Sequence, residues 1–354
     1  MQTLSQIRSL LDAAGRRPRK ALGQNFLVDQ NLMRKLLGLA DLRGDEAVLE
    51  VGPGTGSLTE ELLERAGKVV AVELDADLAR ALAARLGGEE KLTLIQGDIL
   101  AGKHRLSPTV LEALGERARL VANLPYNIAT PLAALCLVEA WRACRGRSCG
   151  PQADSAWVRH GGTHGRGAHV TGGQDARASA HATGCDTDGT PVSPTDTCET
   201  PAVRTGTRFE RLTFTVQREV ADRLTAGPGG GEYGPASVFV ALLGRVTPGP
   251  ELPPEAFWPR PKVTSRMLRI DFDIEAAKKI ADMGVLRESL DLAFSQRRKQ
   301  IGSIRRRRDA GFDAAVLDAA LAAAGIDPTA RPEQVPPGQW LKLANILSAD
   351  RNRQ

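Results

Sequence analysis

The segment Asn123-Leu124-Pro125-Tyr126 carries the residue types best suited to chemistry in this chain. It follows a short apolar run, Leu120–Ala122, and so stands where a predicted strand ends. An exocyclic amine on a flat ring such as adenine is a poor nucleophile, because its lone pair is delocalised into the ring. If the Asn123 side-chain oxygen and a backbone carbonyl near Leu124 hold the two amine hydrogens, the lone pair turns toward a methyl donor.

Two further residues of the segment would support this chemistry. Pro125 would fix the turn, and Tyr126 would offer a ring on which a base can stack. Base–aromatic stacking is worth roughly 1–3 kcal/mol. No strong general base is needed, since the methylated ammonium is acidic and can lose its proton to solvent. Catalysis would then be mostly positioning. The alternative is a strand-ending turn in which proline and tyrosine occur by chance.

A glycine-rich segment, Gly52-Pro53-Gly54-Thr55-Gly56, follows an earlier predicted strand. Glycine lets the backbone turn tightly and approach a ligand at the positive end of the next helix. Gly52 and Gly54 are therefore candidate cofactor-binding residues. The segment is not G-x-G-x-x-G, because residue 57 is serine, and a purely structural turn is the alternative.

Two acidic residues end two further predicted strands. Glu73 stands 21 residues after Gly52, where a carboxylate can accept both hydroxyls of a ribose. A dinucleotide enzyme would place an acid similarly, so Glu73 does not separate NAD from S-adenosylmethionine. Taken alone it could also be a solvated acid at a helix start, as we expect for Asp75. Asp98 is suited to accept the adenine amine of a cofactor, with a helix cap as the alternative.

Phe257 is a candidate for contact with the base. It lies in the segment Ala256-Phe257-Trp258-Pro259-Arg260-Pro261 and could cover the face of the base opposite Tyr126. An aromatic residue between prolines is also a common packing residue, and the sequence does not decide between the two roles.

These residues stand on alternating strands and helices. Predicted strands cover 47–51, 69–74, 92–96, 120–122, 212–216 and 263–272, and predicted helices lie between them, the first opened by a capping box at Ser57–Glu60. The alternation predicts an α/β fold with a doubly wound, mostly parallel sheet. Ligands of such sheets gather at the carboxyl ends of the strands, where the candidate residues stand.

The sequence predicts two domains, 1–274 and 275–354. After Ile274 the pattern becomes purely helical, with predicted helices over 283–301, 314–324 and 340–347. The first domain is interrupted at about 143–207. Residues 145–207 contain 11 glycines and no Leu, Ile, Met, Phe or Tyr, so we expect a disordered, dispensable insertion.

A zinc site is the rival interpretation of this insertion. Its ligands would be four cysteines and four histidines, namely Cys144, Cys149, Cys185 and Cys198 with His160, His164, His169 and His181. These are the right ligand types, but the spacings contain no C-x-x-C pair. We therefore expect no metal.

Charge and composition narrow the class of protein. Lys and Arg outnumber Asp and Glu by 47 to 42, and basic residues cluster at 16–20 and 297–308, which suits a polyanion or a solvated charged face. No run approaches the roughly 18 apolar residues of a membrane span, and the N-terminus lacks a signal-peptide core. Five cysteines do not suggest a disulfide framework. We expect a soluble, cytoplasmic protein.

The sequence resembles the KsgA/RsmA family of ribosomal RNA small-subunit adenine N6,N6-dimethyltransferases. The matching segments follow one another in the expected order over most of residues 16–308, apart from the insertion. They are Leu22-Gly23-Gln24-Asn25-Phe26-Leu27, Glu50 to Gly56, Val72-Glu73-Leu74-Asp75, Gly97-Asp98, Asn123 to Asn127, Gln217-Arg218-Glu219-Val220-Ala221, Pro259 to Val263 and Phe294 to Lys299.

This resemblance implies a class I methyltransferase fold, Rossmann-like, with a small helical C-terminal domain. It implies dimethylation of N6 on two adjacent adenosines near the 3′ end of small-subunit rRNA in immature 30S particles. It also implies S-adenosylmethionine as methyl donor, a monomer, and a role in ribosome biogenesis. The implied cofactor contacts are Asn25, Leu27, Gly52, Gly54, Glu73, Asp98 and Asn123. Asn25 and Leu27 belong to an N-terminal segment that, by resemblance, folds over the cofactor.

Three other functions are considered. A related antibiotic-resistance methyltransferase of large-subunit rRNA shares the core, but the helical C-terminal region with Phe294 to Lys299 favours the small-subunit enzyme. A non-enzymatic assembly factor is disfavoured by the intact Glu73, Asp98 and Asn123 to Tyr126. A DNA adenine methyltransferase would be expected to show Pro-Pro-Tyr, and residue 124 is leucine.

Overall fold

A computed structural model describes most of the chain. The described residues are 1–13, 15–19, 23–102, 105–125, 127–145, 206–306 and 311–353. Tyr126 and nearly all of the predicted insertion lie outside them.

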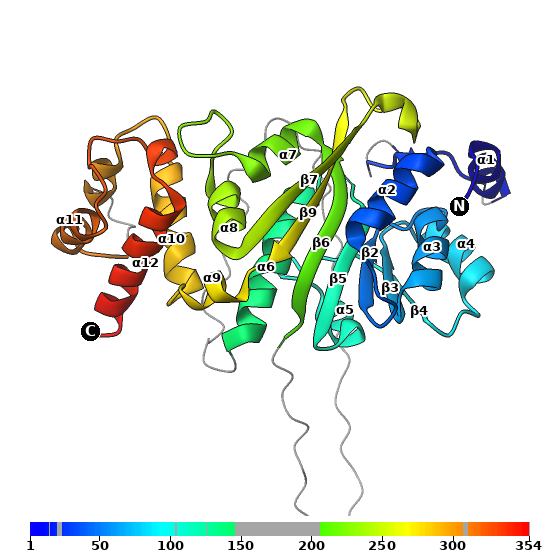
Figure 1. Ribbon diagram of the computed structural model, residues 1–354, viewed down its shortest axis with the longest axis horizontal. Helices are drawn as coiled ribbons and strands as arrows, with labels where there is room; N and C mark the ends of the chain where they lie inside the picture. The colour runs from blue at the N-terminus through cyan, green and yellow to red at the C-terminus, as the bar shows by residue number, and fades with distance from the viewer. Residues whose placement is uncertain are drawn as a thin grey trace, which may run out of the picture. The chain divides into compact units, whose positions relative to one another are not determined.

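A central sheet carries the site. Within the described residues it has seven strands in the order β4-β3-β2-β5-β6-β9-β7. Their bounds are β2 Ala47–Val51, β3 Lys68–Glu73, β4 Leu92–Gln96, β5 Arg117–Asn123, β6 Arg208–Gln217, β7 Gly244–Leu252 and β9 Ser265–Phe272. β4, β3, β2, β5 and β6 pair in parallel, whereas β9 pairs antiparallel with β6 and β7. The predicted doubly wound, mostly parallel sheet is confirmed (Figure 1).

Helices fill the connections between these strands. Their bounds are α2 Gln30–Ala40, α3 Ser57–Arg65, α4 Ala76–Leu86, α5 Pro108–Leu114, α6 Ala129–Arg145, α7 Arg218–Thr225 and α8 Pro235–Leu243. The predicted capping box is wrong, because α3 already begins at Ser57 with Gly56 as its N-cap. The Ser57 hydroxyl instead accepts a hydrogen bond from the backbone N–H of Gln2 at 3.1 Å.

Alternate residues of the parallel strands bury on opposite faces of the sheet. In β2, Leu49 and Val51 belong to one buried cluster, together with residues of α5 and α6. Val48, which directly precedes Leu49, belongs to a second cluster with residues of α2 and α3. Both faces of the sheet are therefore covered, as a parallel sheet requires. This leaves the carboxyl ends of the strands as the place for a ligand.

Helices follow the sheet at the C-terminal end of the chain. They are α9 Ile274–Lys278, α10 Met283–Phe294, α11 Ala314–Ala323 and α12 Pro337–Arg351, with 3₁₀ turns at Ile301–Arg306 and Pro332–Gln334. A further 3₁₀ turn, Pro254–Ala256, lies between β7 and β9. Helix α10 ends at Phe294, before the predicted end at residue 301. The run that follows, Gln296–Gln300, is wholly polar and offers no apolar face to pack.

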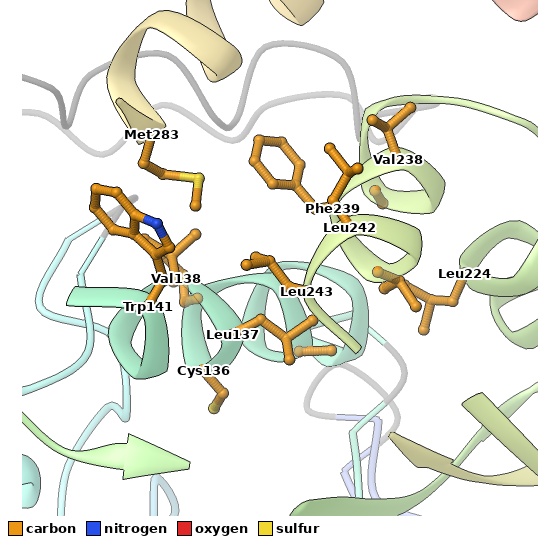
Figure 2. Packing of buried hydrophobic residues seen from close by; sticks show 14 of the residues in the cluster. Cys136, Leu137, Val138, Trp141, Leu224, Val238, Phe239, Leu242, Leu243 and Met283 are labelled. Carbon is orange, nitrogen blue, oxygen red and sulfur yellow. The ribbon is translucent and has the colours of Figure 1, made fainter. Parts of the chain in front are cut away.

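The C-terminal helices share a buried core with the sheet domain. Figure 2 shows Met283 of α10 directed toward Trp141 of α6 and Phe239 of α8, and all three belong to one cluster. The buried Tyr233 hydroxyl also donates to the carbonyl of Val335 at 2.9 Å. The predicted division at residues 274 and 275 stays a prediction, since this core crosses it.

The N-terminal segment forms a small layer of its own. Helix α1 (Leu4–Ala13) buries Ile7 and Leu11 in a cluster with Leu78 of α4. Strand β1 (Phe26–Leu27) pairs antiparallel with β8 (Phe257–Trp258). These contacts hold the N-terminal segment beside the carboxyl ends of the central strands.

Candidate active site

A cavity of about 210 Å³ opens where the strand order reverses between β2 and β5. Gly52 follows β2, Asn123 ends β5, and both line the cavity. Asp98, after β4, and Glu73, at the end of β3, line it as well. The crevice outside the carboxyl ends at a switch point is the usual ligand site of such folds. The topology of the sheet therefore brings these four residues to one cavity, as predicted from their places at strand ends.

The glycine loop needs glycine for geometric reasons. Gly52, Gly54 and Gly56 have φ angles of +72°, +59° and +82°. A Cβ atom on Gly54 would also lie 2.7 Å from the ring of Phe26. The loop can thus approach a ligand closely only because these side chains are missing.

Glu73 joins this loop to the end of β3. Its Oε2 accepts from the Gly54 N–H at 3.0 Å, and its Oε1 accepts from the Asp75 N–H at 2.9 Å. The side chain is 5% exposed, and burial raises its pKa above the ordinary value. Each carboxylate oxygen can accept a second hydrogen bond, so the group can still receive ribose hydroxyls.

Glu50 is a site residue that the sequence reasoning missed. It lines the cavity at 2% exposure, and its Oε2 has no hydrogen-bond partner within the described part of the chain. Burial raises the pKa of Glu50 to about 8, and the nearby Glu73 carboxylate adds to the shift. The sequence did contain a signal for this residue, because Glu50 is the one acidic residue in the otherwise apolar strand 47–51.

The other two acids differ in setting. Asp98 is exposed, and its Oδ1 accepts from the Leu100 N–H at 2.9 Å, which forms a turn and not a helix cap. The expectation that Asp75 is solvated is wrong. Asp75 is 4% exposed, caps α4 by accepting from the Asp77 N–H, and pairs with Arg19 at 3.3 Å.

Asn123 is held from two sides. Its Nδ2 donates to the backbone carbonyl of Asn25 at 2.8 Å, and its Oδ1 accepts from the Thr215 hydroxyl. Asn25 and Leu27 line the cavity, so the N-terminal segment does lie beside the predicted cofactor site. Leu124 and Pro125 line it too, with Leu124 buried at 2% exposure.

Phe257 lies apart from the cavity. It is 3% exposed and packs in the cluster formed with α2 and α3, and it is not among the described residues that line the cavity. Its pairing with Leu27 across β1 and β8 explains this burial. Contact with a base would require the side chain to move, so its predicted role stays a prediction.

The charge of the cavity helps to distinguish a dinucleotide ligand from S-adenosylmethionine, which Glu73 alone does not do. Three acidic side chains line it, those of Glu50, Glu73 and Asp98, and none of its described lining residues is Lys, Arg or His. No cationic side chain among the described lining residues would balance the charge of an anionic pyrophosphate. A cationic ligand such as a sulfonium would be attracted.

The basic clusters are partly used inside the protein. Arg16 and Arg19 pair with Asp77 and Asp75 and so fasten the N-terminal segment to α4. Arg297 donates to the carbonyl of Gly231 and lies 3.7 Å from Glu333.

Other basic residues of the second cluster face solvent. Arg305 pairs with Asp318 at 3.2 Å, and Arg298, Lys299 and Arg306 are exposed. Arg307 and Arg308 lie outside the described residues, as does Lys20. The exposed members, Arg298, Lys299, Arg305 and Arg306, are the ones best placed to meet a polyanion.

Fold and cavity together define a class I methyltransferase: a doubly wound sheet whose switch point holds an acidic cavity behind an Asn-Leu-Pro turn. The family model for ribosomal RNA adenine dimethylase matches residues 15–148 and 202–349. The chain belongs to this family and is an rRNA adenine dimethyltransferase, as the resemblance predicted.

Individual relatives agree with this membership. The chain is 32% identical over 352 residues to "Ribosomal RNA small subunit methyltransferase A" of Phenylobacterium zucineum, covering 99% of this chain and 95% of the relative. Among solved structures it is similar to a dimethyladenosine transferase from Plasmodium falciparum, with a TM-score of 0.60, 19% identity, and coverage of 93% and 98%. It is also similar to the 23S rRNA methyltransferase ErmE, with a TM-score of 0.53, 23% identity, and coverage of 92% and 100%. At these identities the two structures support the fold alone.

The described residues contain neither a candidate membrane span nor a candidate metal centre. No helix there is both long and apolar enough to cross a membrane. No group of three His, Cys, Asp or Glu side chains there could hold a metal ion. The ligands proposed for zinc lie outside the described residues except for Cys144, which is a free thiol.

Proposed function

We propose that this enzyme dimethylates N6 of two adjacent adenosines near the 3′ end of small-subunit rRNA, with S-adenosylmethionine as methyl donor. The observation that carries the proposal is the position of Asn123. Its amide stands at the end of β5, beside a cavity lined by carboxylates. The 32% identity to a small-subunit methyltransferase over 99% of this chain supports the choice of rRNA subunit.

The acidic residues would hold the cofactor. Glu73 is suited to the ribose hydroxyls, and Asp98 is suited to the adenine amine. Glu50, buried and with a free oxygen, is suited to a cationic amine. The backbone of Gly52 and Gly54 lets the ligand approach closely. When bound, S-adenosylmethionine supplies an electrophilic methyl group on a positively charged sulfur.

Asn123 would orient the substrate. Its Oδ1 has two lone pairs, of which one faces Thr215 and the other can accept an amine hydrogen. A backbone carbonyl near Leu124 would accept the second hydrogen, and Tyr126 would stack on the base. The amine lone pair would then form the new N–C bond while the S–C bond of the methyl donor breaks, with its electron pair staying on sulfur. The proton of the resulting ammonium would leave to solvent. The same residues would orient the amine for the second methylation, when the nitrogen carries one hydrogen that can be hydrogen-bonded.

The test is methylation of defined ribosomal particles. Purified protein and S-adenosylmethionine are incubated separately with immature 30S particles and with 50S subunits, and the rRNA is digested for mass spectrometry. We expect two dimethyladenosines per 30S particle. Methylation confined to 50S rRNA would favour the large-subunit alternative, and none on either particle would favour an assembly factor.

The proposal includes a monomer that acts in the cytoplasm during ribosome biogenesis. Sedimentation of purified protein tests the monomer. Cell fractionation and the 30S content of a deletion strain test the other two. Co-sedimentation with mature 70S ribosomes alone would contradict a role in biogenesis.

A further inference from the structure

The Asn123 amide is oriented by a partner that can only accept. The carbonyl of Asn25 has no proton to donate, so the group that faces it at 2.8 Å must be the amide Nδ2. The other end of the amide, Oδ1, then faces the Thr215 hydroxyl. Since Oδ1 can only accept, the hydroxyl must donate. Asn25 and Thr215 together fix which end of the amide faces the cavity.

Thr215 is placed to do this by the sheet. It is the cross-strand partner of Asn123 in the parallel pair of β5 and β6. Its side chain is fully buried, at 0% exposure. A β-branched side chain within a strand has restricted rotation about χ1, so the hydroxyl is held in place at little further entropic cost.

We propose that Thr215 is a positioning residue for methyl transfer, acting through Asn123. By donating to Oδ1, its hydroxyl stops the amide from rotating and leaves the second lone pair of Oδ1 for the target amine. This inference rests on the proposed function, because it assumes that Asn123 receives that amine. Thr215 itself is not among the described residues that line the cavity.

Loss of the hydroxyl has a specific consequence. In Thr215→Val the side chain keeps its shape, but Oδ1 loses its donor. The amide can then rotate, and a misplaced acceptor no longer turns the amine lone pair toward the methyl group. Because catalysis here is positioning, we expect kcat to fall roughly 10- to 100-fold. The KM for 30S particles and the Kd for S-adenosylmethionine should change less than about threefold, since Thr215 is buried and does not line the cavity.

The chain offers a matched control on the same strand. Thr213 is also in β6 and is also 0% exposed, but its hydroxyl has no hydrogen-bond partner in the described part of the chain. Thr213→Val therefore makes the same chemical change without touching Asn123. Thr215→Ser keeps the donor and should retain most of the wild-type kcat.

The experiment compares wild type, Thr215→Val, Thr215→Ser and Thr213→Val on immature 30S particles. Single-turnover rates, KM, cofactor affinity by calorimetry and Tm are measured for each. A low rate confined to Thr215→Val, with rescue by serine, supports the proposal. Equal rates for the two valine variants would overturn it. If wild type itself does not methylate 30S particles, the proposed function fails and this inference fails with it.

Coupling to Asn123 provides the second measurement. In an Asn123→Ala background, Thr215→Val should lower the rate no further, because the amide on which it acts is gone. Additive losses would overturn the proposal, since they would mean that Thr215 acts elsewhere. If Thr215→Val does not fold, Thr215→Ala takes its place in both comparisons, judged against Thr213→Ala.

Discussion

At the scale of single residues, the proposed catalytic role of the cavity depends first on Asn123. We expect Asn123→Ala to lower kcat roughly 100- to 1,000-fold, as is typical when one preorganised polar group is removed. Cofactor affinity should fall much less, although the hydrogen bond to the Asn25 carbonyl is lost as well. Methylation of immature 30S particles and calorimetry measure the two effects. Near wild-type methylation would contradict the role of Asn123.

Glu73 binds the ribose of the cofactor in the proposed function. Glu73→Ala removes a carboxylate that accepts from two backbone N–H groups and faces the cavity. We expect affinity for S-adenosylmethionine to fall roughly 10- to 100-fold, the range for hydrogen bonds to a charged group. Titration calorimetry measures this, with NAD as the comparison ligand. Unchanged affinity, or tight binding of NAD by wild type, would refute the assignment.

Glu50 predicts a pH-dependent stability. Its pKa is about 8 in the folded protein, against an ordinary value of 4.5. Between these values the folded protein retains a proton that the unfolded chain has lost. The free energy of unfolding therefore falls as the pH rises through this window and is level above it.

Glutamine at this position cannot ionise, so the Glu50→Gln variant should lack this fall in the free energy of unfolding. Without cofactor, the Tm of the Gln variant should rise relative to wild type between about pH 5 and about pH 8.5. Glu64→Gln is the control, because its side chain on α3 is 71% exposed. Parallel Tm profiles for Glu50→Gln and wild type would show that Glu50 is ionised in the folded protein.

At the scale of elements, the connection from β2 to α3 is the part that tolerates substitution least. We expect Gly54→Ala to destabilise the protein by about 1–3 kcal/mol and to abolish cofactor binding, because its φ is +59° and Phe26 occupies the space of a Cβ atom. Gly38→Ala in α2 is the control. Nothing lies within 4 Å of its Cβ position, so a helix-favouring alanine should be neutral or stabilising. Chemical denaturation measures both, and equal effects would contradict the geometric argument.

The N-terminal segment is the element whose function depends most on tertiary contacts. Arg16 and Arg19, which look like an rRNA patch in the sequence, instead pair with acids at the start of α4. Asn25 reaches Asn123 through its backbone, so the identity of its side chain does not reveal that contact.

At the scale of the whole molecule, the exposed basic residues after α10 should meet rRNA phosphates. Each phosphate contact removed should lower the slope of log K against log salt by roughly 0.7–0.9. Neutralising Arg305 to Arg308 should therefore weaken 30S binding and flatten this slope. Arg80→Gln, at a residue 79% exposed on α4, controls for net charge. A slope unchanged in the quadruple variant would mean that these arginines form only a solvated face.

The sequence by itself determined the parallel α/β fold and the edge of the sheet where the cavity opens. Strand ends are local features, marked by Gly52, Glu73, Asp98 and Asn123, and a parallel sheet gathers its carboxyl ends at one edge. The motifs also determined the family, which the family model confirms.

Only the tertiary structure decided which side chains are buried and what they contact. Thr215 meets Asn123 across 92 residues of chain, and Glu50, on a strand of the sheet, is buried at 2% exposure. Phe257 is drawn into the core by its pairing with Leu27, and Arg297 is used to hold a loop. None of these contacts has a local signal, because the pKa of a buried acid and the partner of a hydroxyl depend on atoms brought together from distant parts of the chain.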